Sequence, residues 1–272
     1  MASLSAQFTD RSEYGASEMP LVRIIDQWIY VIIAAFFIVI VLVGFIPDSF
    51  GMLAAVNAGR QPPIPPIMHV HAVLMGSFLL LLLAQAVLAA TGRLQYHQTL
   101  GLLAFALIPA IVIAGFILVP TVYHSLIDGL KTAPPPAQAE IRQVIPIVDD
   151  IMLLQIRIGV LFPLFVGISL AVRKSDSGLH KRLMFLALAP ALAASINRMP
   201  WLPTTLPANP LASDLYVLLA VTPMFAWDLY RTRKVHKAYL IWLAGVIPAA
   251  VVVSLLWNTA WWHSIAPHLV GA

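Results

Sequence analysis

Residues 68–90 read MHVHAVLMGSFLLLLLAQAVLAA and contain no Asp, Glu, Lys or Arg. A helix needs about 20 predominantly apolar residues to cross the hydrocarbon core of a bilayer. The whole chain of 272 residues is 60% hydrophobic and 10% charged, whereas soluble domains are about half apolar and about a quarter charged. The sequence therefore predicts an all-α, polytopic integral membrane protein that lies in a lipid bilayer.

Six other windows resemble this one in length and composition, which predicts a bundle of about seven transmembrane helices. The predicted spans are residues 28–46, 68–90, 100–122, 151–172, 183–199, 213–230 and 238–257. The fifth window is short, and the sixth carries Asp214 and Asp228 near its ends. The chain thus divides into an amino-terminal tail with an interfacial segment (1–27), one membrane domain (28–257) and a carboxyl-terminal tail (258–272).

The positions of lysine and arginine predict the orientation, because short loops rich in these residues stay in the cytoplasm. With the amino terminus inside, the cytoplasmic loops carry Arg93, Arg173, Lys174, Lys181, Arg182, Arg231, Arg233, Lys234 and Lys237. Only Arg60, Lys131 and Arg142 fall in the outer loops. An odd number of spans then places the carboxyl terminus outside.

Composition also excludes several function classes. The chain has no cysteine, so disulfides, thiolate metal sites and cysteine nucleophiles are excluded. The formal net charge of +4 does not indicate nucleic acid binding, because no basic soluble domain accompanies it. A retinal protein needs a lysine in the middle of its last span, whereas Lys237 lies at the start of that span. The histidine pairs of diheme bundles and the histidine clusters of membrane di-iron enzymes are also absent.

Three histidines are predicted at the cytoplasmic ends of alternate spans. His97, His180 and His236 open the third, fifth and seventh spans. The positive end of a helix dipole disfavours an imidazolium, so each ring would tend to stay neutral and able to ligate a metal or relay a proton. The alternative is that they are interfacial residues with one polar edge in the headgroups.

A second set of candidates is predicted near the outer ends of the spans. His69 and His71 are two residues apart, so a regular helix cannot direct both to one site. His71 shares a face with Gln85, whose amide needs a partner inside the membrane. The residues considered as outer metal ligands are His69, His71, His124 and Asp149.

The fourth span carries an arginine inside the predicted membrane domain. Arg157 lies about two turns beyond Asp150 on the same helix face. An ionisable side chain within a bilayer is a functional-site hypothesis by default, and its alternative is an internal ion pair that only joins helices. With Arg198 it could line an outer basic pocket. The candidate ligand-binding residues are Arg157, Arg198, Asp150 and Gln85.

Four short motifs lie at these positions. They are His-x-His (His69, His71), Gly-Arg-x-x-x-His (Gly92 to His97), His-Lys-Arg-Leu-Met (His180 to Met184) and Arg-x-x-x-Val-His (Arg231 to His236). Over most of its length the chain resembles a family of uncharacterised multi-pass bacterial inner-membrane proteins. The resemblance implies the fold and the location, singles out His71, His97, His180, Arg198 and His236, and implies no activity. Gln98 and Arg157 depart from the pattern.

Three hypotheses about function follow, and catalytic residues are not assigned. The first is a histidine-liganded haem b or transition-metal protein with an electron-transfer or oxidoreductase role. The second is a carrier, receptor or sensor for a small anionic or amphiphilic ligand bound at Arg157 and Arg198. The third is an accessory or assembly subunit of a membrane complex. Alanine- and glycine-rich faces of the third and fifth spans would permit close contact with a second copy or with another membrane protein.

Overall fold

A computed structural model describes residues 20–272, and every regular element in that range is helical. The elements are α1 (Pro20–Asn57), α2 (Pro66–Ala90), α3 (Leu94–Gly101), α4 (Ala104–Thr132), α5 (Pro135–Val172), α6 (Ser177–Leu188), η2 (Ala189–Ala191), α7 (Leu192–Ile196), α8 (Leu211–Thr232), α9 (Lys237–Leu256) and α10 (Ala260–Leu269). The predicted all-α bundle is confirmed.

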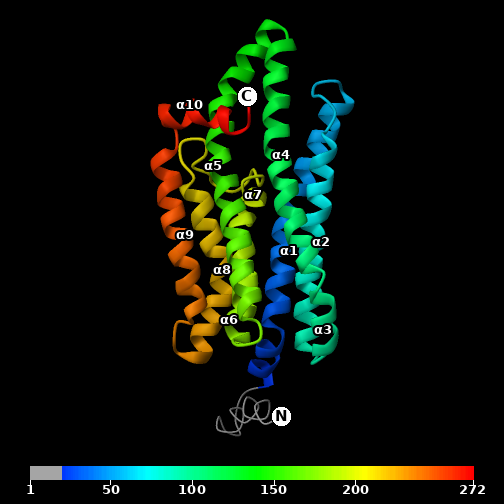
Figure 1. Cartoon of the computed structure of the whole chain (residues 1–272), viewed down its shortest axis with the longest axis vertical. Coiled ribbons are helices and arrows are strands. Elements are labelled where there is room, and N and C mark those ends of the chain that lie inside the picture. The colour runs from blue at the N-terminus through cyan, green and yellow to red at the C-terminus, as the bar shows by residue number, and fades with distance from the viewer. Residues whose placement is uncertain (1–19) are drawn as a thin grey trace.

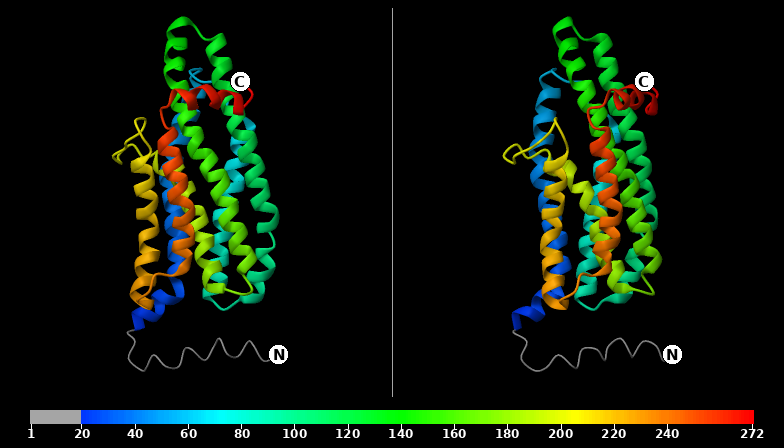
Figure 2. Two further views of the ribbon diagram at one scale, coloured as in Figure 1. Left: turned by 60° about the vertical axis from the view of Figure 1, so that its left-hand side comes forward. Right: turned by 90° about the vertical axis from the view of Figure 1, so that its left-hand side faces the viewer.

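The long helices run side by side along one axis, as Figures 1 and 2 show. The end that carries α10 and the α4–α5 hairpin is called the upper end, and the opposite end, with α3 and the α5–α6 and α8–α9 connections, is the lower end (Figure 1). The short helix α10 lies across the upper end of the bundle rather than along it (Figures 1 and 2). The predicted outer and cytoplasmic residues therefore separate onto the upper and lower ends.

Local sequence signals explain where the helices begin. Pro66 stands in the first turn of α2 and Pro135 in the first turn of α5, positions where a missing backbone N–H costs nothing. At the start of α6 the carboxylate of Asp176 accepts a hydrogen bond from the Leu179 N–H at 2.8 Å, and at the start of α10 the hydroxyl of Thr259 accepts one from the Trp262 N–H at 3.2 Å. Both are standard N-cap arrangements.

The centre of the bundle is the continuous segment α6–η2–α7. Most of this segment is buried, whereas less than half of every other candidate span is buried inside the protein. Two glycines permit close contacts between helices. A Cβ at Gly44 of α1 would clash with Ser195 of α7, and a Cβ at Gly245 of α9 would clash with Phe165 of α5. The remaining helices expose large apolar side chains on their outer faces, as a lipid-facing surface requires.

Among the described residues, six helical segments are long and apolar enough to cross a membrane. They include α6–α7, which covers the short fifth predicted span. The helix α8 is not among them, although it packs against α1, α7 and η2, so the count of seven spans stays a prediction. The first helix begins at Pro20, within the predicted tail of residues 1–27, and residues 1–19 lie outside the described part.

Candidate functional site

In the first turns of α3, residues 94–99, only His97 is partly buried, and the other five residues are exposed. The neighbouring helix α2 fixes the His97 ring. The Nδ1 atom of His97 lies 3.2 Å from the main-chain oxygen of Gln85 on α2. A carbonyl oxygen only accepts hydrogen bonds, so Nδ1 carries the proton of the neutral ring. The lone pair of the neutral imidazole is therefore on Nε2, which the bond to Gln85 leaves unused.

His180 on α6 has the same arrangement. Its Nδ1 lies 3.0 Å from the main-chain oxygen of Ser169 on α5, and the Ser169 hydroxyl donates to the main-chain oxygen of His180 at 2.9 Å. The proton of the neutral ring is again on Nδ1, and Nε2 again holds a free lone pair. Because Ser169 is completely buried, the orientation of this ring is set by the packing of α5 on α6.

The two rings belong to one region of the lower end. His97 lies on α3 and His180 near the start of α6, and both helix segments lie at the lower end of the bundle (Figure 1). A Cβ at Gly101 would lie 3.6 Å from the Gln85 Nε2, and Gly101 is one turn from His97 on the same face of α3. Neither amide atom of Gln85 has a hydrogen-bond partner among residues 20–272, although both are buried. A buried amide without partners, facing the helix that carries His97, is a polar site that a bound group could satisfy.

His236, the third predicted lower-end histidine, serves a different purpose. Its Nδ1 accepts a hydrogen bond from the Ala238 N–H at 3.1 Å and caps α9. The neutral ring then carries its proton on Nε2 and has no lone pair left for a metal. Partial burial and the nearby Arg182 guanidinium lower the pKa of His236, which favours this neutral capping form.

The sequence did not single out the buried ion pair that lies next to this cap. Arg182 on α6 makes two hydrogen bonds to the carboxylate of Asp228 on α8, at 2.7 and 2.6 Å. The hydroxyl of Tyr239 on α9 donates to the same carboxylate. The available signals were the position of Arg182 inside the His-Lys-Arg motif and a lone carboxylate near the end of the sixth window.

At the upper end, Arg157 pairs with a residue on another helix. Its guanidinium makes two hydrogen bonds to Asp214 of α8, at 2.6 and 3.1 Å, and its side chain is 3% exposed. Asp150, which shares its helix face, is engaged elsewhere. Arg157 thus forms an internal ion pair that joins α5 to α8, which is the alternative that the sequence left open, with Asp214 as the partner.

The predicted outer basic pocket is not formed by Arg157 and Arg198. Arg198 donates from Nε to Asp48 of α1 at 2.9 Å, and its guanidinium stacks over Phe45 at 4.5 Å. Each arginine thus has its own carboxylate, and neither offers an uncompensated charge to an anion.

Asp149 and Asp150 hold α10 in place. The hydroxyl of Tyr123 donates to the Asp149 carboxylate at 2.9 Å, and the Trp262 indole donates to the Asp149 main-chain oxygen at 2.7 Å. Asp150 accepts the Asn258 N–H at 2.9 Å and lies 3.2 Å from the His263 Nε2. Both aspartates are buried, so their contacts join the carboxyl-terminal helix to the upper end of the bundle.

The proposed outer metal ligands do not converge. His124 points to the main-chain oxygen of Val270 at 2.8 Å, His69 is exposed, and the buried Nδ1 of His71 has no partner within the described chain. Across residues 20–272, no group of three His, Asp or Glu side chains could hold a metal ion. A donor set at the upper end therefore has no geometric basis.

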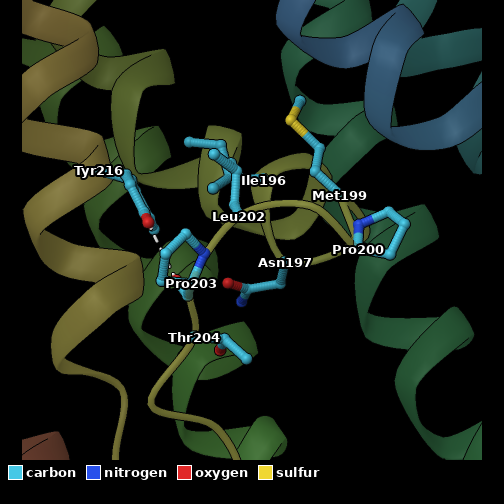
Figure 3. Close-up of a pocket in the computed structure, with 8 residues that line it drawn as sticks. All are labelled: Ile196, Asn197, Met199, Pro200, Leu202, Pro203, Thr204 and Tyr216. Carbon is cyan, nitrogen blue, oxygen red and sulfur yellow. Dashed lines mark hydrogen bonds between the residues drawn. The ribbon is translucent and has the colours of Figure 1, made fainter.

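A small cavity lies beside the Pro200–Pro210 loop, and Figure 3 shows the side chains that surround it. Its volume is about 90 Å³, well below the roughly 300 Å³ at which ligand pockets begin. The hydroxyl of Tyr216 closes one side by donating to the main-chain oxygen of Pro203 at 2.9 Å (Figure 3). This cavity has room for water but not for a cofactor.

Comparison with protein-family models, with curated proteins and with solved structures finds no match to the chain. The resemblance seen in the sequence therefore stays a prediction, and the case for function depends on the lower-end geometry.

Proposed function

We propose that this membrane protein binds a haem b or a single transition-metal ion through His97 and His180 and takes part in electron transfer. The observation that carries the proposal is the shared arrangement of the two rings, each with Nδ1 on a main-chain oxygen and Nε2 free. Ligating histidines commonly donate their other ring N–H to a backbone carbonyl, which fixes the tautomer and raises the basicity of the ligand.

Each of the chain's own residues then has a definite part. Ser169 and the main chain of Gln85 hold the imidazoles in one orientation. The unpartnered Gln85 amide supplies a donor and an acceptor to a bound group. Imidazole nitrogen suits haem iron as well as zinc, copper and iron ions, and a redox-active group held here would supply one-electron chemistry.

The test is an absorption spectrum of the detergent-purified protein, oxidised and dithionite-reduced, with metal analysis of the same sample after incubation with haem. The wild-type protein should give a reduced haem band or stoichiometric metal. His97→Ala and His180→Ala should each lower the bound fraction at least tenfold, since even second-shell changes cost about 10- to 100-fold in affinity. His268→Ala, which changes an exposed histidine on α10, should leave it unchanged.

Two further measurements separate loss of a ligand from loss of the fold. The midpoint of thermal unfolding should stay close to that of the wild type in both alanine variants, and added imidazole should restore part of the spectrum. A folded wild-type protein that takes up neither haem nor metal would contradict the proposal, as would two alanine variants that keep the full band.

A further inference from the structure

A groove with mostly apolar walls runs along the outside of the α2–α3 junction at the lower end. It has a volume of about 420 Å³ and is lined by Leu88, Arg93, Tyr96, Thr99 and Leu100. Cavities of about 300 to 1,000 Å³ are the size that small ligands occupy. This groove, unlike the upper cavity, is large enough for part of an amphiphilic molecule.

The backbone of the junction places one cation at this groove. Helix α2 ends at Ala90, and Gly92 takes a φ of +72°, which reverses the chain at little cost. The Arg93 N–H then donates to the Leu88 oxygen at 2.8 Å, so Arg93 and Leu88 are joined where the groove begins. The turn therefore fixes the backbone position from which the Arg93 side chain extends.

Arg93 differs from the arginines inside the bundle in having no carboxylate partner. Its guanidinium makes no hydrogen bond or ion pair with the described residues, and it is exposed. Arg157, Arg182 and Arg198, in contrast, are each paired with an aspartate. An unpaired guanidinium beside apolar walls is complementary to a molecule with an anionic head and an apolar tail.

We propose that this groove binds an anionic phospholipid, with the phosphate on Arg93 and an acyl chain along Leu88 and Leu100. A guanidinium binds phosphate oxygens in pairs, and a tyrosine such as Tyr96 is typical of the membrane–water interface. The orientation predicted from lysine and arginine places this end at the cytoplasmic leaflet, where anionic lipids attract basic residues. The proposal is independent of cofactor binding at His97 and His180.

The experiment uses the full chain, delipidated in a neutral detergent, with thermal unfolding followed as lipid is added. A ligand that binds only the folded state raises the unfolding midpoint with concentration. Phosphatidylglycerol in mixed micelles should raise the midpoint, whereas phosphatidylcholine and inorganic phosphate at the same concentration should not. Arg93→Gln should weaken the apparent Kd about fivefold, which corresponds to the roughly 1 kcal/mol that one basic residue contributes near an anionic surface.

Two further variants make the test specific to the groove. Arg23→Gln removes another exposed arginine near the lower end, which has no partner among residues 20–272 and does not line the groove. This variant should bind phosphatidylglycerol like the wild type. Thr99→Phe places a ring where the acyl chain is expected and should abolish the shift while keeping Arg93. Equal binding by Arg93→Gln and the wild type would overturn the proposal. Equal shifts with phosphatidylcholine or with inorganic phosphate would overturn it too.

Discussion

At the scale of single residues, the sequence located the polar positions but not their partners. His97 and His180 were predicted as ligands from their places at helix starts, and the oxygens that fix their tautomers come from Gln85 and Ser169 on other helices. Every residue has a main-chain oxygen, so the sequence does not indicate which of them a histidine will contact. For the same reason the capping role of His236 was not foreseen, because it depends on the turn before α9.

A prediction at this scale concerns Asp176, which caps α6 and pairs with Lys237 at 2.6 Å. The Lys237 ammonium and the Leu179 N–H lower the pKa of Asp176 below its usual value of about 3.9. Because the folded-state pKa is the lower one, the charged carboxylate stabilises the fold above about pH 4, and this stabilisation is lost as the pH falls through the lowered pKa.

The measurement compares unfolding midpoints of Asp176→Ala and Asp176→Asn with the wild type between neutral and acidic pH. Asp176→Ala should cost about 1 kcal/mol through the lost cap, and Asp176→Asn should cost less because asparagine also caps helices. The difference between the wild type and Asp176→Asn should be constant at neutral pH and vanish in acid. A difference that grows in acid would contradict the assigned sign.

At the scale of elements, α8 is held by two charge pairs instead of by apolar surface alone. Asp214 and Asp228 lie four turns apart, about 21 Å along the helix, and fall on nearly one face. One binds Arg157 of α5 near the upper end and the other binds Arg182 of α6 near the lower end. The same two carboxylates lowered the mean hydropathy of the sixth predicted span, because a hydropathy scale takes no account of ion pairing.

The consequence for stability is testable at the lower pair, whose side chains are 9% and 11% exposed. Asp228→Ala should destabilise the protein by about 3–5 kcal/mol, because it leaves the Arg182 charge buried and unpaired. The double variant Arg182→Met with Asp228→Leu should recover most of that loss. Asp128→Ala removes the exposed partner of Lys131, 68% and 70% exposed, and should change stability by less than about 1 kcal/mol.

Denaturant or thermal unfolding in detergent measures all three variants against the wild type. If the double variant is no more stable than Asp228→Ala, the pair acts through Tyr239 and the capping network and not through charge compensation. An equal loss at the exposed and buried pairs would show that burial does not set the cost.

At the scale of the whole molecule, composition alone predicted the helical bundle, and the residue positions predicted which groups share an end. The predicted cytoplasmic clusters at Arg173 and Arg231 and the histidines His97, His180 and His236 all belong to the lower end. The number of spans depends on α8, because α8 must cross the bilayer for Arg23 and His268 to lie on opposite sides of the membrane.

The absence of cysteine from the chain makes this arrangement directly measurable. Single substitutions Arg23→Cys, Lys174→Cys, Arg142→Cys and His268→Cys, all at exposed positions, can be treated in intact cells with a membrane-impermeant maleimide. Seven spans with a cytoplasmic lower end predict labelling at positions 142 and 268 before lysis and at positions 23 and 174 only afterwards. Labelling of 23 and 268 on the same side would mean an even number of spans and would remove α8 from the membrane. Labelling of 23 and 174 before lysis would reverse the orientation, and with it the leaflet that the Arg93 groove faces.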